Sequence, residues 1–149
     1  MIIRNAIESD VTILNSLFQQ LVEYERQNYD SNIKKDLIID SYFDKRIHSG
    51  HEIVLVALVN DVVVGYCYSI IDFDNKIKME LEGRIDSIFV VKEYRNRNIG
   101  TELINKSVAE LKDKGVKHIF ITNIYENSKA GKLYNKLGFK IFKEERKLL

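Results

Sequence analysis

Apolar residues recur along this chain at two different periods, which divide it into predicted helices and strands. Near its start, Ser9 or Asp10 can cap a helix. The apolar residues that follow recur every three or four positions, as on the buried face of a helix; they are Ile13, Leu14, Leu17, Phe18, Leu21 and Val22. A second helix is predicted over residues 34–48, with Gly50 as its stop signal. Its expected buried residues are Leu37, Ile38, Tyr42 and Phe43.

The middle of the chain has the composition of strands. Residues 53–59 and 62–71 are rich in β-branched and aromatic side chains. Asn60 and Asp61, which separate them, are a good signal for a two-residue hairpin turn. Residues 85–91 have a similar composition. The pattern therefore predicts a hairpin followed by a further strand.

Helix and strand patterns alternate in the remainder of the chain. One helix is predicted up to Gly115, with its apolar stripe at Ile99, Leu103, Ile104, Val108 and Leu111. A strand follows over residues 118–124, and another helix ends at Gly138, with apolar positions at Ala130, Leu133, Tyr134 and Leu137. Phe139 is expected to open a final strand. This element order indicates an α/β sandwich with a mixed sheet rather than a purely parallel one.

The size and composition are those of one globular domain over residues 1–149. Of these 149 residues 45% are hydrophobic, and no apolar run approaches the roughly 18 residues that span a bilayer. The first residues contain no apolar signal segment, so we expect a cytosolic protein. Cys67 is the only cysteine, and we interpret it as a small core residue. The three histidines and this cysteine lack the spacing of a tetrahedral site, so no metal is expected.

Basic and acidic side chains nearly balance, at 23 against 22, but they are unevenly distributed. Residues 1–75 hold 6 Lys or Arg against 12 Asp or Glu, and residues 76–149 hold 17 against 10. Such a chain can receive a cation on its acidic half and a polyanion on its basic half, although ordinary surface composition gives the same split. Because no nucleic-acid-binding motif accompanies the basic half, a nucleic-acid partner is not expected.

The clearest chemical signal lies where the predicted strand at 85–91 runs through a basic loop into a helix. Free backbone N–H groups at a helix start bind phosphate without a dedicated catalytic side chain. Arg95 and Arg97 would reinforce such a site. The loop is neither a Walker loop nor a dinucleotide fingerprint, because Gly100 is its only glycine. On this evidence, an ordinary turn with solvated arginines is the alternative.

Two stretches of the chain carry patterns of one known family. Residues 95–100 read Arg-Asn-Arg-Asn-Ile-Gly, and residues 127–139 read NSKAGKLYNKLGF. They resemble the acetyl-CoA loop Arg/Gln-x-x-Gly-x-Gly/Ala and the downstream segment Asn-x-x-Ala-x-x-Leu-Tyr-x-Lys-x-Gly-Phe of the GCN5-related N-acetyltransferases (GNAT). The two matches occur in the family's order. The resemblance implies a GNAT-like three-layer α/β/α sandwich with a central mixed, mostly antiparallel sheet.

The chain departs from the family pattern at two places. Asn98 stands where the loop pattern has its middle glycine. Asn tolerates left-handed backbone better than other non-glycine residues, but its side chain crowds the approach of phosphate, so we expect weaker cofactor binding. The tail after Phe139 is too short for the terminal hairpin often seen in the family. We therefore expect an open sheet edge that a homodimer partner can use.

The resemblance also implies which residues contact the cofactor. Main-chain groups of Phe89, Val90 and Val91 would pair with the pantetheine arm of acetyl-CoA like an added strand. Asn127 would bond the same arm, although it is equally well placed as a helix N-cap. The loop would hold the pyrophosphate, through Arg95, Arg97, Asn98, Ile99, Gly100 and Thr101.

By the same resemblance, Tyr134 donates a proton or hydrogen bond to the departing sulfur, and Asp86 accepts the proton of the amine. Without the family resemblance, Tyr134 is interpreted as a core aromatic residue and Asp86 as a surface charge paired with Arg84. The acidic side chains of one stretch could attract the substrate, or could simply be solvated; they are Asp72, Asp74, Glu80 and Glu82. Four further residues could line the substrate pocket, or could simply face solvent or core; they are Tyr24, Glu25, Tyr29 and Tyr42.

Together these features predict an enzyme, an acetyl-CoA-dependent N-acetyltransferase acting directly on a primary amine of a small molecule. A protein N-terminus or lysine is the alternative acceptor. A non-catalytic acyl-CoA-binding or regulatory module is the alternative outside the enzymes. It is motivated by Asn98 in the phosphate loop and by the unidentified base, and it would share the same binding site. The expected partners are acetyl-CoA as co-substrate and an amine, with no nucleic acid and no membrane.

Overall fold

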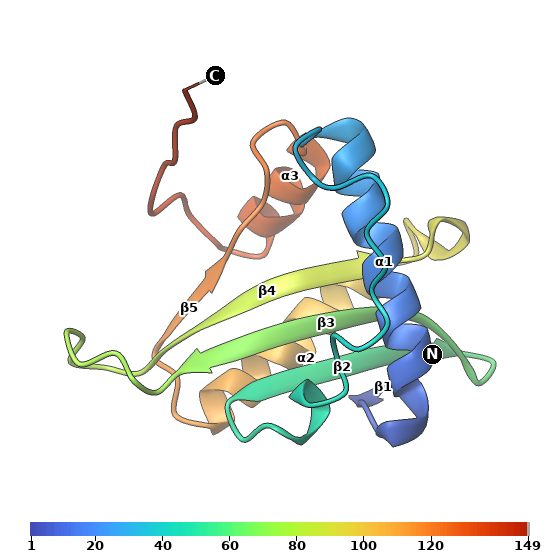
Figure 1. Cartoon of the computed structure of the whole chain (residues 1–149). Helices are drawn as coiled ribbons and strands as arrows, with labels where there is room; N and C mark the ends of the chain where they lie inside the picture. Colours follow the sequence, from blue (N-terminus) through green and yellow to red (C-terminus); the bar gives the residue numbers. More distant parts are fainter. Residues whose placement is uncertain (149) are drawn as a thin grey trace.

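A five-stranded sheet forms the centre of the computed structural model, which describes residues 1–148 (Figure 1). β4 and β5 pair in parallel and all other neighbouring strands pair antiparallel. In order across the sheet, the strands are β1 (Ile2–Asn5), β2 (Glu52–Val59), β3 (Val62–Asp72), β4 (Glu82–Val90) and β5 (His118–Ile121). The predicted mixed, mostly antiparallel sheet is therefore confirmed.

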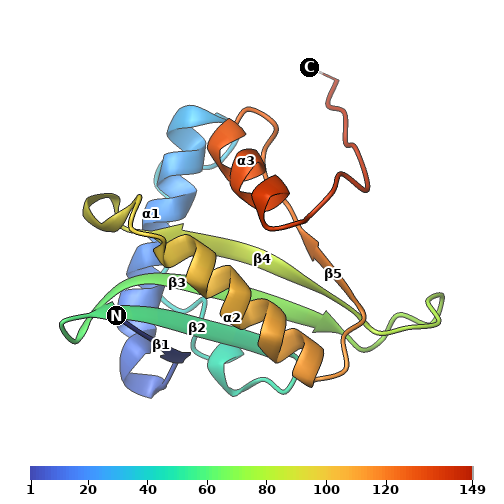
Figure 2. The same ribbon diagram turned by 180° about the vertical axis from the view of Figure 1, so that it is seen from behind.

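Helices cover both faces of the sheet and give the molecule three layers. On one face lie α1 (Val11–Asn28) and the segment 29–51, in front of the sheet in Figure 1. On the other face lie α2 (Ile99–Asp113) and α3 (Ser128–Lys136), which Figure 2 shows in front. Three single turns of 3-10 helix complete the elements: η1 (Glu8–Asp10), η2 (Arg46–His48) and η3 (Lys92–Tyr94). This is the expected α/β/α sandwich.

Each face of the sheet has its own apolar core, because successive side chains of a strand point to opposite faces. Toward α1, Leu14 and Leu17 pack against Tyr66 and Tyr68. Toward α2 and α3, Cys67 lies fully buried in the second cluster. Burial raises the pKa of its thiol to about 12, so the thiol stays neutral and unreactive. The interpretation of this cysteine as a core residue is confirmed.

The predicted hairpin between β2 and β3 is present. Asn60 and Asp61 have φ of 49° and 62°, the left-handed pair that a two-residue turn of the primed type requires. Gly115 and Gly138, which follow α2 and α3, also have positive φ, at 89° and 92°. Their lack of a side chain lets the chain leave each helix in this conformation.

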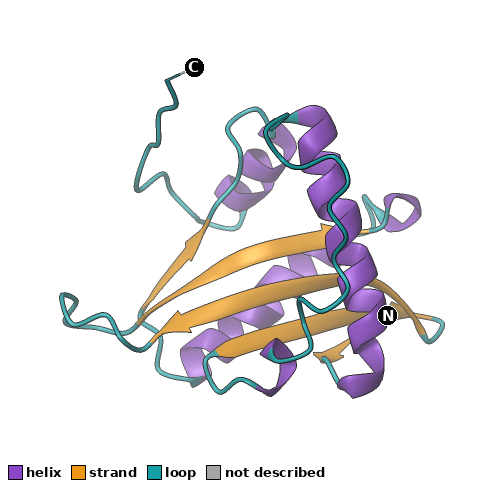
Figure 3. Cartoon of the chain, viewed as in Figure 1, coloured by secondary structure: helices purple, strands orange, loops and turns teal. Residues whose placement is uncertain are grey.

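The helix predicted over residues 34–48 is wrong, because this segment is a loop apart from η2 (Figure 3). The amide side chain of Asn15 on α1 makes hydrogen bonds to the main chain of this loop. Asn15 Nδ2 donates to the carbonyl of Asp40 at 2.9 Å, and Asn15 Oδ1 accepts from the N–H of Phe43 at 2.9 Å. These bonds satisfy main-chain groups that a helix would have paired internally. Phe43 is nevertheless fully buried, as predicted.

One turn further along α1, Gln19 holds the same loop. Its Nε2 donates to the carbonyl of Leu37 at 2.7 Å, and its Oε1 accepts from the N–H of Ile39 at 2.6 Å. In this conformation Ile38, expected on a buried helix face, is 81% exposed. The loop therefore lies against α1 through amide hydrogen bonds rather than through an apolar stripe.

The strand expected to begin at Phe139 is also wrong: residues 137–148 contain no strand and extend beyond α3 (Figure 1). Six of the nine residues 140–148 are charged, which leaves little apolar surface to hold a strand on the sheet. Phe142 contacts Phe120 of β5, with ring centroids 5.3 Å apart. The use of the outer edge of β5 by a homodimer partner stays a prediction.

Candidate active site

Strands β4 and β5 separate partway along their length, and this opening is the centre of the candidate site. They pair from Glu82 with His118 to Ile85 with Ile121. β5 ends there, whereas β4 continues to Val90 (Figure 1). Beyond Ile85, no strand within residues 1–148 pairs with that side of β4. Such an open edge can accept an extended ligand in the manner of an added strand.

Only alternate residues of β4 present their main-chain groups to this opening. The N–H of Val91 donates to the carbonyl of Val64 on β3 at 3.0 Å. Because the direction alternates along a strand, Phe89 also turns its main-chain groups toward β3. Ile88 and Val90 therefore face the opening. Of the three residues expected to pair with pantetheine, Val90 is the one that faces it, and Ile88, which the sequence patterns had not indicated, joins it.

The Arg95 side chain lies along β4 rather than out in the loop. Its Nε donates to the carbonyl of Val90 at 2.8 Å. Its guanidinium carbon lies 5.3 Å from the ring centre of Phe89 and 5.6 Å from that of Tyr24 on α1. Arg95 thus connects the basic loop to the open strand edge and to α1. The Arg97 side chain lies over the ring of Tyr94, and the phosphate contacts expected of Arg95 and Arg97 stay predictions.

The loop before α2 has the backbone of an anion-binding turn. Asn96 and Asn98 are left-handed, with φ of 61° and 66°. Asn98 is the N-cap of α2, and its Nδ2 donates to Oε1 of Glu102 at 3.2 Å. The N–H groups of the first helical residues, 99–101, have no carbonyl within the helix to bond. They are free for an anion at the positive end of the helix dipole.

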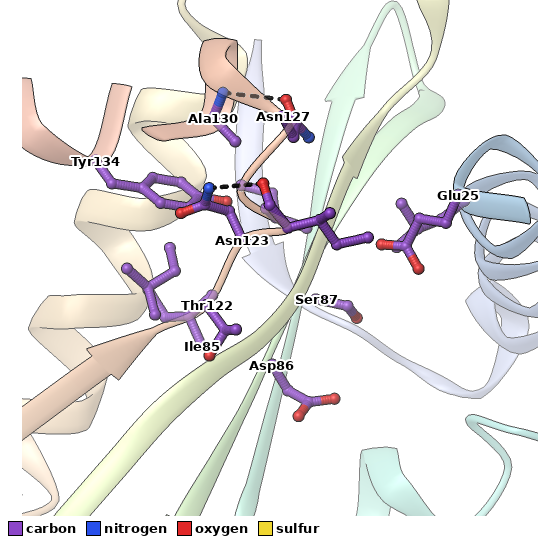
Figure 4. Close-up of a pocket in the computed structure, with 13 residues that line it drawn as sticks. Glu25, Ile85, Asp86, Ser87, Thr122, Asn123, Asn127, Ala130 and Tyr134 are labelled. Carbon is purple, nitrogen blue, oxygen red and sulfur yellow. Dashed lines mark hydrogen bonds between the residues drawn. The ribbon is translucent and has the colours of Figure 1, made fainter. Parts of the chain in front are cut away.

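Asn127 begins α3 as its N-cap. Its Oδ1 accepts a hydrogen bond from the N–H of Ala130 at 3.3 Å, as the dashed line in Figure 4 marks. The structural role that the sequence allowed for Asn127 is therefore present. Asn127 also lines the pocket at the strand opening, so its expected contact with the cofactor stays a prediction.

A pocket of about 80 Å³ lies at the strand opening and brings together side chains from three elements (Figure 4). Tyr134 enters it from α3, Asp86 and Ser87 from β4, and Glu25 from α1. These residues come from segments up to about a hundred positions apart in the chain. The sequence had indicated Tyr134 and Asp86 as the catalytic pair, and the fold places both in one pocket.

Tyr134 is 8% exposed; it packs in the apolar core and also lines the pocket. Both positions that the sequence allowed for it are therefore present. Burial raises the pKa of its phenol to about 12, and the nearby Cys67 and Glu25 contribute to the rise. The phenol therefore keeps its proton throughout the neutral range. A neutral phenol facing the pocket can donate a hydrogen bond to a developing thiolate.

Asp86 lies at a β-bulge, where the register between β3 and β4 shifts and leaves it without a partner on β3. Bulges of this kind often re-aim a side chain beside an active site. Its Oδ1 lies 3.3 Å from Nε of Arg84, and its side chain is 32% exposed. Asp86 thus lines the pocket and also forms the ion pair with Arg84 that the sequence allowed.

Glu25 occupies the α1 side of the same pocket. Its carboxylate is half-buried, and burial raises its pKa, with a further contribution from Asp30. The sequence had indicated Glu25 only as one of four candidate lining residues. No local pattern distinguishes it, because it reaches the pocket only through the packing of α1 on the sheet.

The other substrate-side candidates lie outside this pocket. Tyr42 packs on Phe18, with ring centroids 4.0 Å apart, and lies below the guanidinium of Arg46. Tyr24 and Tyr29 place their hydroxyls 3.4 Å from each other. The acidic stretch around the β3–β4 loop lies at the far end of β4 from Val90, and none of its carboxylates lines the pocket.

Two properties of residues 1–148 bear on function. No three His, Cys, Asp or Glu side chains in this part of the chain are arranged to hold a metal ion. None of its helices combines the length and apolar character needed to cross a bilayer.

Known proteins resemble this chain in sequence. The family model described as Acetyltransferase (GNAT) family matches residues 14–139. The chain is 33% identical over 93 residues to N-alpha-acetyltransferase 30 of Schizosaccharomyces pombe, covering 62% of this chain and 61% of that protein. It is 28% identical over 138 residues to an uncharacterized N-acetyltransferase of Methanocaldococcus jannaschii, covering 92% and 59%. The chain thus spans about three fifths of the length of these relatives.

Solved structures resemble it in fold. A tetramutant of the BH1408 protein from Bacillus halodurans superimposes with a TM-score of 0.88 at 19% identity, covering 100% of this chain and 99% of that one. An acetyltransferase from Vibrio fischeri gives 0.68 at 28% identity, covering 81% and 94%. Aminoglycoside N-acetyltransferase AAC(6')-Iy in complex with CoA gives 0.71 at 20% identity, covering 97% and 99%.

Proposed function

The chain belongs to the acetyltransferase (GNAT) family, and from this premise we propose that it is an acetyl-CoA-dependent N-acetyltransferase. The reaction is direct transfer of an acetyl group from the thioester to a primary amine. The observation that carries the proposal is the opening between β4 and β5. There the unpaired edge of β4 leads from an anion-binding loop to a pocket that holds a neutral phenol and two carboxylates.

The chain's own groups fit the co-substrate. Main-chain groups of Ile88 and Val90 would pair with the amide arm of pantetheine, which then lies along β4 as an added strand. The main-chain N–H groups of residues 97–101 and the Arg97 side chain would hold the pyrophosphate. The carbonyl of Val90, which now accepts a hydrogen bond from Arg95, would then accept one from the arm as well or in its place. Acetyl-CoA supplies the activated acetyl group as a thioester.

In the pocket, Tyr134 is proposed to donate to the sulfur as the carbon–sulfur bond breaks. Its burial beside the opening keeps the hydroxyl protonated, and the side chain lines the pocket that the arm would reach. An alkylamine titrates near 10.4, so at neutral pH a base must take its proton. Asp86 and Glu25 are the carboxylates that line the pocket.

A small-molecule amine is the proposed acceptor. The pocket of about 80 Å³ holds only a few water-sized groups, which suits the narrow end of an unbranched amine. A protein N-terminus is the second candidate, and the relatives named N-alpha-acetyltransferase favour it. A panel of polyamines, amino acids, aminoglycosides and short peptides separates the two by which class supports turnover.

The proposal predicts that Tyr134→Phe separates catalysis from binding. Loss of the hydroxyl should lower kcat at least about tenfold and leave the calorimetric Kd for acetyl-CoA nearly unchanged. Tyr125→Phe is the matched control, since Tyr125 is 93% exposed and lies outside the pocket. Equal turnover in Tyr134→Phe would remove the donor role. Wild-type protein that binds acetyl-CoA but acetylates no amine would be a regulatory module instead.

A further inference from the structure

Glu25 reaches the pocket from α1, on the side opposite Tyr134 (Figure 4). We propose that Glu25, rather than Asp86, takes the proton from the acceptor amine. This inference rests on the proposed acetyl transfer and names a further catalytic residue for it. Asp86 then serves as a fixed charge that helps attract the cationic amine into the pocket.

The placement of the two groups suits a direct transfer. Tyr134 belongs to the layer that carries the phosphate loop, and Glu25 to the layer on the opposite face of the sheet. Nucleophile and leaving group lie in different directions from the reacting carbon. A proton acceptor on the α1 side and a donor on the α3 side therefore let the amine enter from one layer while the thiol leaves along the other.

The surroundings of the two carboxylates favour Glu25 as the base. Asp86 is already engaged in an ion pair, because its Oδ1 lies 3.3 Å from Nε of Arg84. Within residues 1–148, the Glu25 carboxylate has no ion pair and accepts no hydrogen bond. It also lies in the last two turns of α1, at the negative end of the helix dipole.

The titratable groups that interact with Glu25 are carboxyls and phenols. They are Asp30, whose carboxylate also lies 3.7 Å from Nζ of Lys147, with Tyr29, Tyr66 and Tyr134; Asp86 lines the same pocket. Partial burial raises the pKa of Glu25, and the Asp30 carboxylate raises it further, which improves Glu25 as a proton acceptor near neutral pH.

Ser87 offers a way to hold the amine between these groups. Its side chain lines the same pocket and its hydroxyl neighbours that of Tyr66, but neither buried hydroxyl has a hydrogen-bond partner of normal geometry among the described residues. An unpartnered buried hydroxyl is costly, and a bound amine or water would satisfy it. Ser87 is thus a positioning residue for the nitrogen on its way to Glu25.

The proton and electron changes balance as follows. The Glu25 carboxylate takes one proton from the ammonium form of the acceptor and later loses it to solvent. The nitrogen lone pair forms the bond to the thioester carbonyl carbon, and the carbon–sulfur bond breaks with its electron pair on sulfur. Tyr134 protonates the sulfur and regains a proton from the second N–H. The products are the amide, the free thiol and one released proton.

The test compares Glu25→Gln with the matched variant Asp86→Asn over a range of pH, with the best amine of the panel. Glu25→Gln should lower kcat at pH 7 by about a hundredfold or more, whereas Asp86→Asn should lower it less than about tenfold. Activity of Glu25→Gln should then climb about tenfold per pH unit toward the pKa of the amine, because solvent must deprotonate it. A purely structural role would not produce this recovery.

Two control measurements show whether Glu25→Gln loses activity only because it binds acetyl-CoA poorly or is less stable. Glu25→Gln should keep the calorimetric Kd for acetyl-CoA and should melt no lower than wild type, since it removes a half-buried charge. Near-wild-type turnover in Glu25→Gln, or recovery at high pH in Asp86→Asn alone, would overturn the inference and leave the proposed function standing. Wild-type protein that releases no thiol with any amine would overturn the proposed function and this inference with it.

Discussion

Asn98 shows how one side chain can tune the binding loop. It holds the left-handed turn that begins α2, with φ of 66°, and its amide bonds Glu102. The expectation that Asn permits this turn is confirmed. The effect of its side chain on phosphate binding stays a prediction: a side chain at this position would limit how closely an anion can approach the backbone N–H groups.

Asn98→Gly should bind acetyl-CoA more tightly. Glycine adopts the same φ without a side chain in the path of the phosphate, so Kd should fall about fivefold, or about 1 kcal/mol. The melting temperature should change little, because Gly and Asn differ by only a few tenths of a kcal/mol as N-caps. Asn96→Gly is the control, since Asn96 is also left-handed but does not cap the helix. An unchanged or weaker Kd for Asn98→Gly would contradict this interpretation, and calorimetry measures both.

At the residue scale, sequence patterns located the groups near the two family motifs. Tyr134 and Asp86 were identified in this way, and they line one pocket. Ile88 was missed because the direction of a strand's main-chain groups depends on its pairing register, which the sequence does not reveal. Glu25 was not singled out because its distance from the pocket is set by helix packing.

Among the elements, the connection from β1 to α1 depends on one ion pair. Arg4 Nη1 and Nη2 bind the two carboxylate oxygens of Asp10 at 2.6 and 3.1 Å. The same carboxylate accepts the N–H of Ile7 at 2.8 Å. Asp10 is buried, and the hydrogen bond from Arg4 holds its pKa below the usual range. This junction fixes where α1, and with it Glu25, begins its path across the sheet.

Asp10→Asn should destabilise the protein by about 2 kcal/mol at pH 7, because it leaves a charged hydrogen-bond partner unpaired. A lowered folded pKa contributes stability above the pKa of the unfolded chain and loses it as pH falls through the folded value. The difference between wild type and Asp10→Asn should therefore shrink below about pH 4. Urea unfolding at several pH values measures it, with Asp61→Asn in the exposed hairpin turn as control. A difference that is constant with pH would contradict the assigned role.

At the element scale, periodicity identified α1, α2, α3 and the hairpin, because each buries a regular apolar face. It failed for residues 34–48, where Asn15 and Gln19 supply hydrogen bonds from 18 to 28 positions away. It failed again after Phe139, where a single apolar pair is followed by charged residues. Both failures concern segments whose conformation depends on partners distant in sequence.

On the scale of the whole molecule, the charge asymmetry of the sequence separates onto the two faces of the sheet. The α1 layer, residues 6–51, holds 5 Lys or Arg against 8 Asp or Glu. Residues 92–117 and 123–148, which carry α2 and α3, hold 14 against 7. A polyanionic donor and a cationic acceptor would thus each approach a layer of opposite charge.

This charge distribution predicts that acetyl-CoA binding weakens with salt. Its Kd should rise several-fold between about 50 and about 500 mM salt, because ions screen the attraction between phosphates and the basic layer. Acetyl-pantetheine, which lacks the nucleotide phosphates, is the control and should show little salt dependence. Equal salt dependence for the two donors, measured by calorimetry, would contradict a phosphate site on this layer.

The sandwich and its family could be predicted because two motifs and the order of elements agree. The acceptor could not, since the pocket also takes side chains from α1 and β4, and both elements lie outside the two family motifs. The measurement that tests the central claim most directly is amine-dependent release of the CoA thiol from acetyl-CoA, with the acetylated amine counted by mass spectrometry. We predict one acetylated amine per thiol released, and none without protein. Thiol release that is independent of added amine, or no release with any amine, would contradict the account.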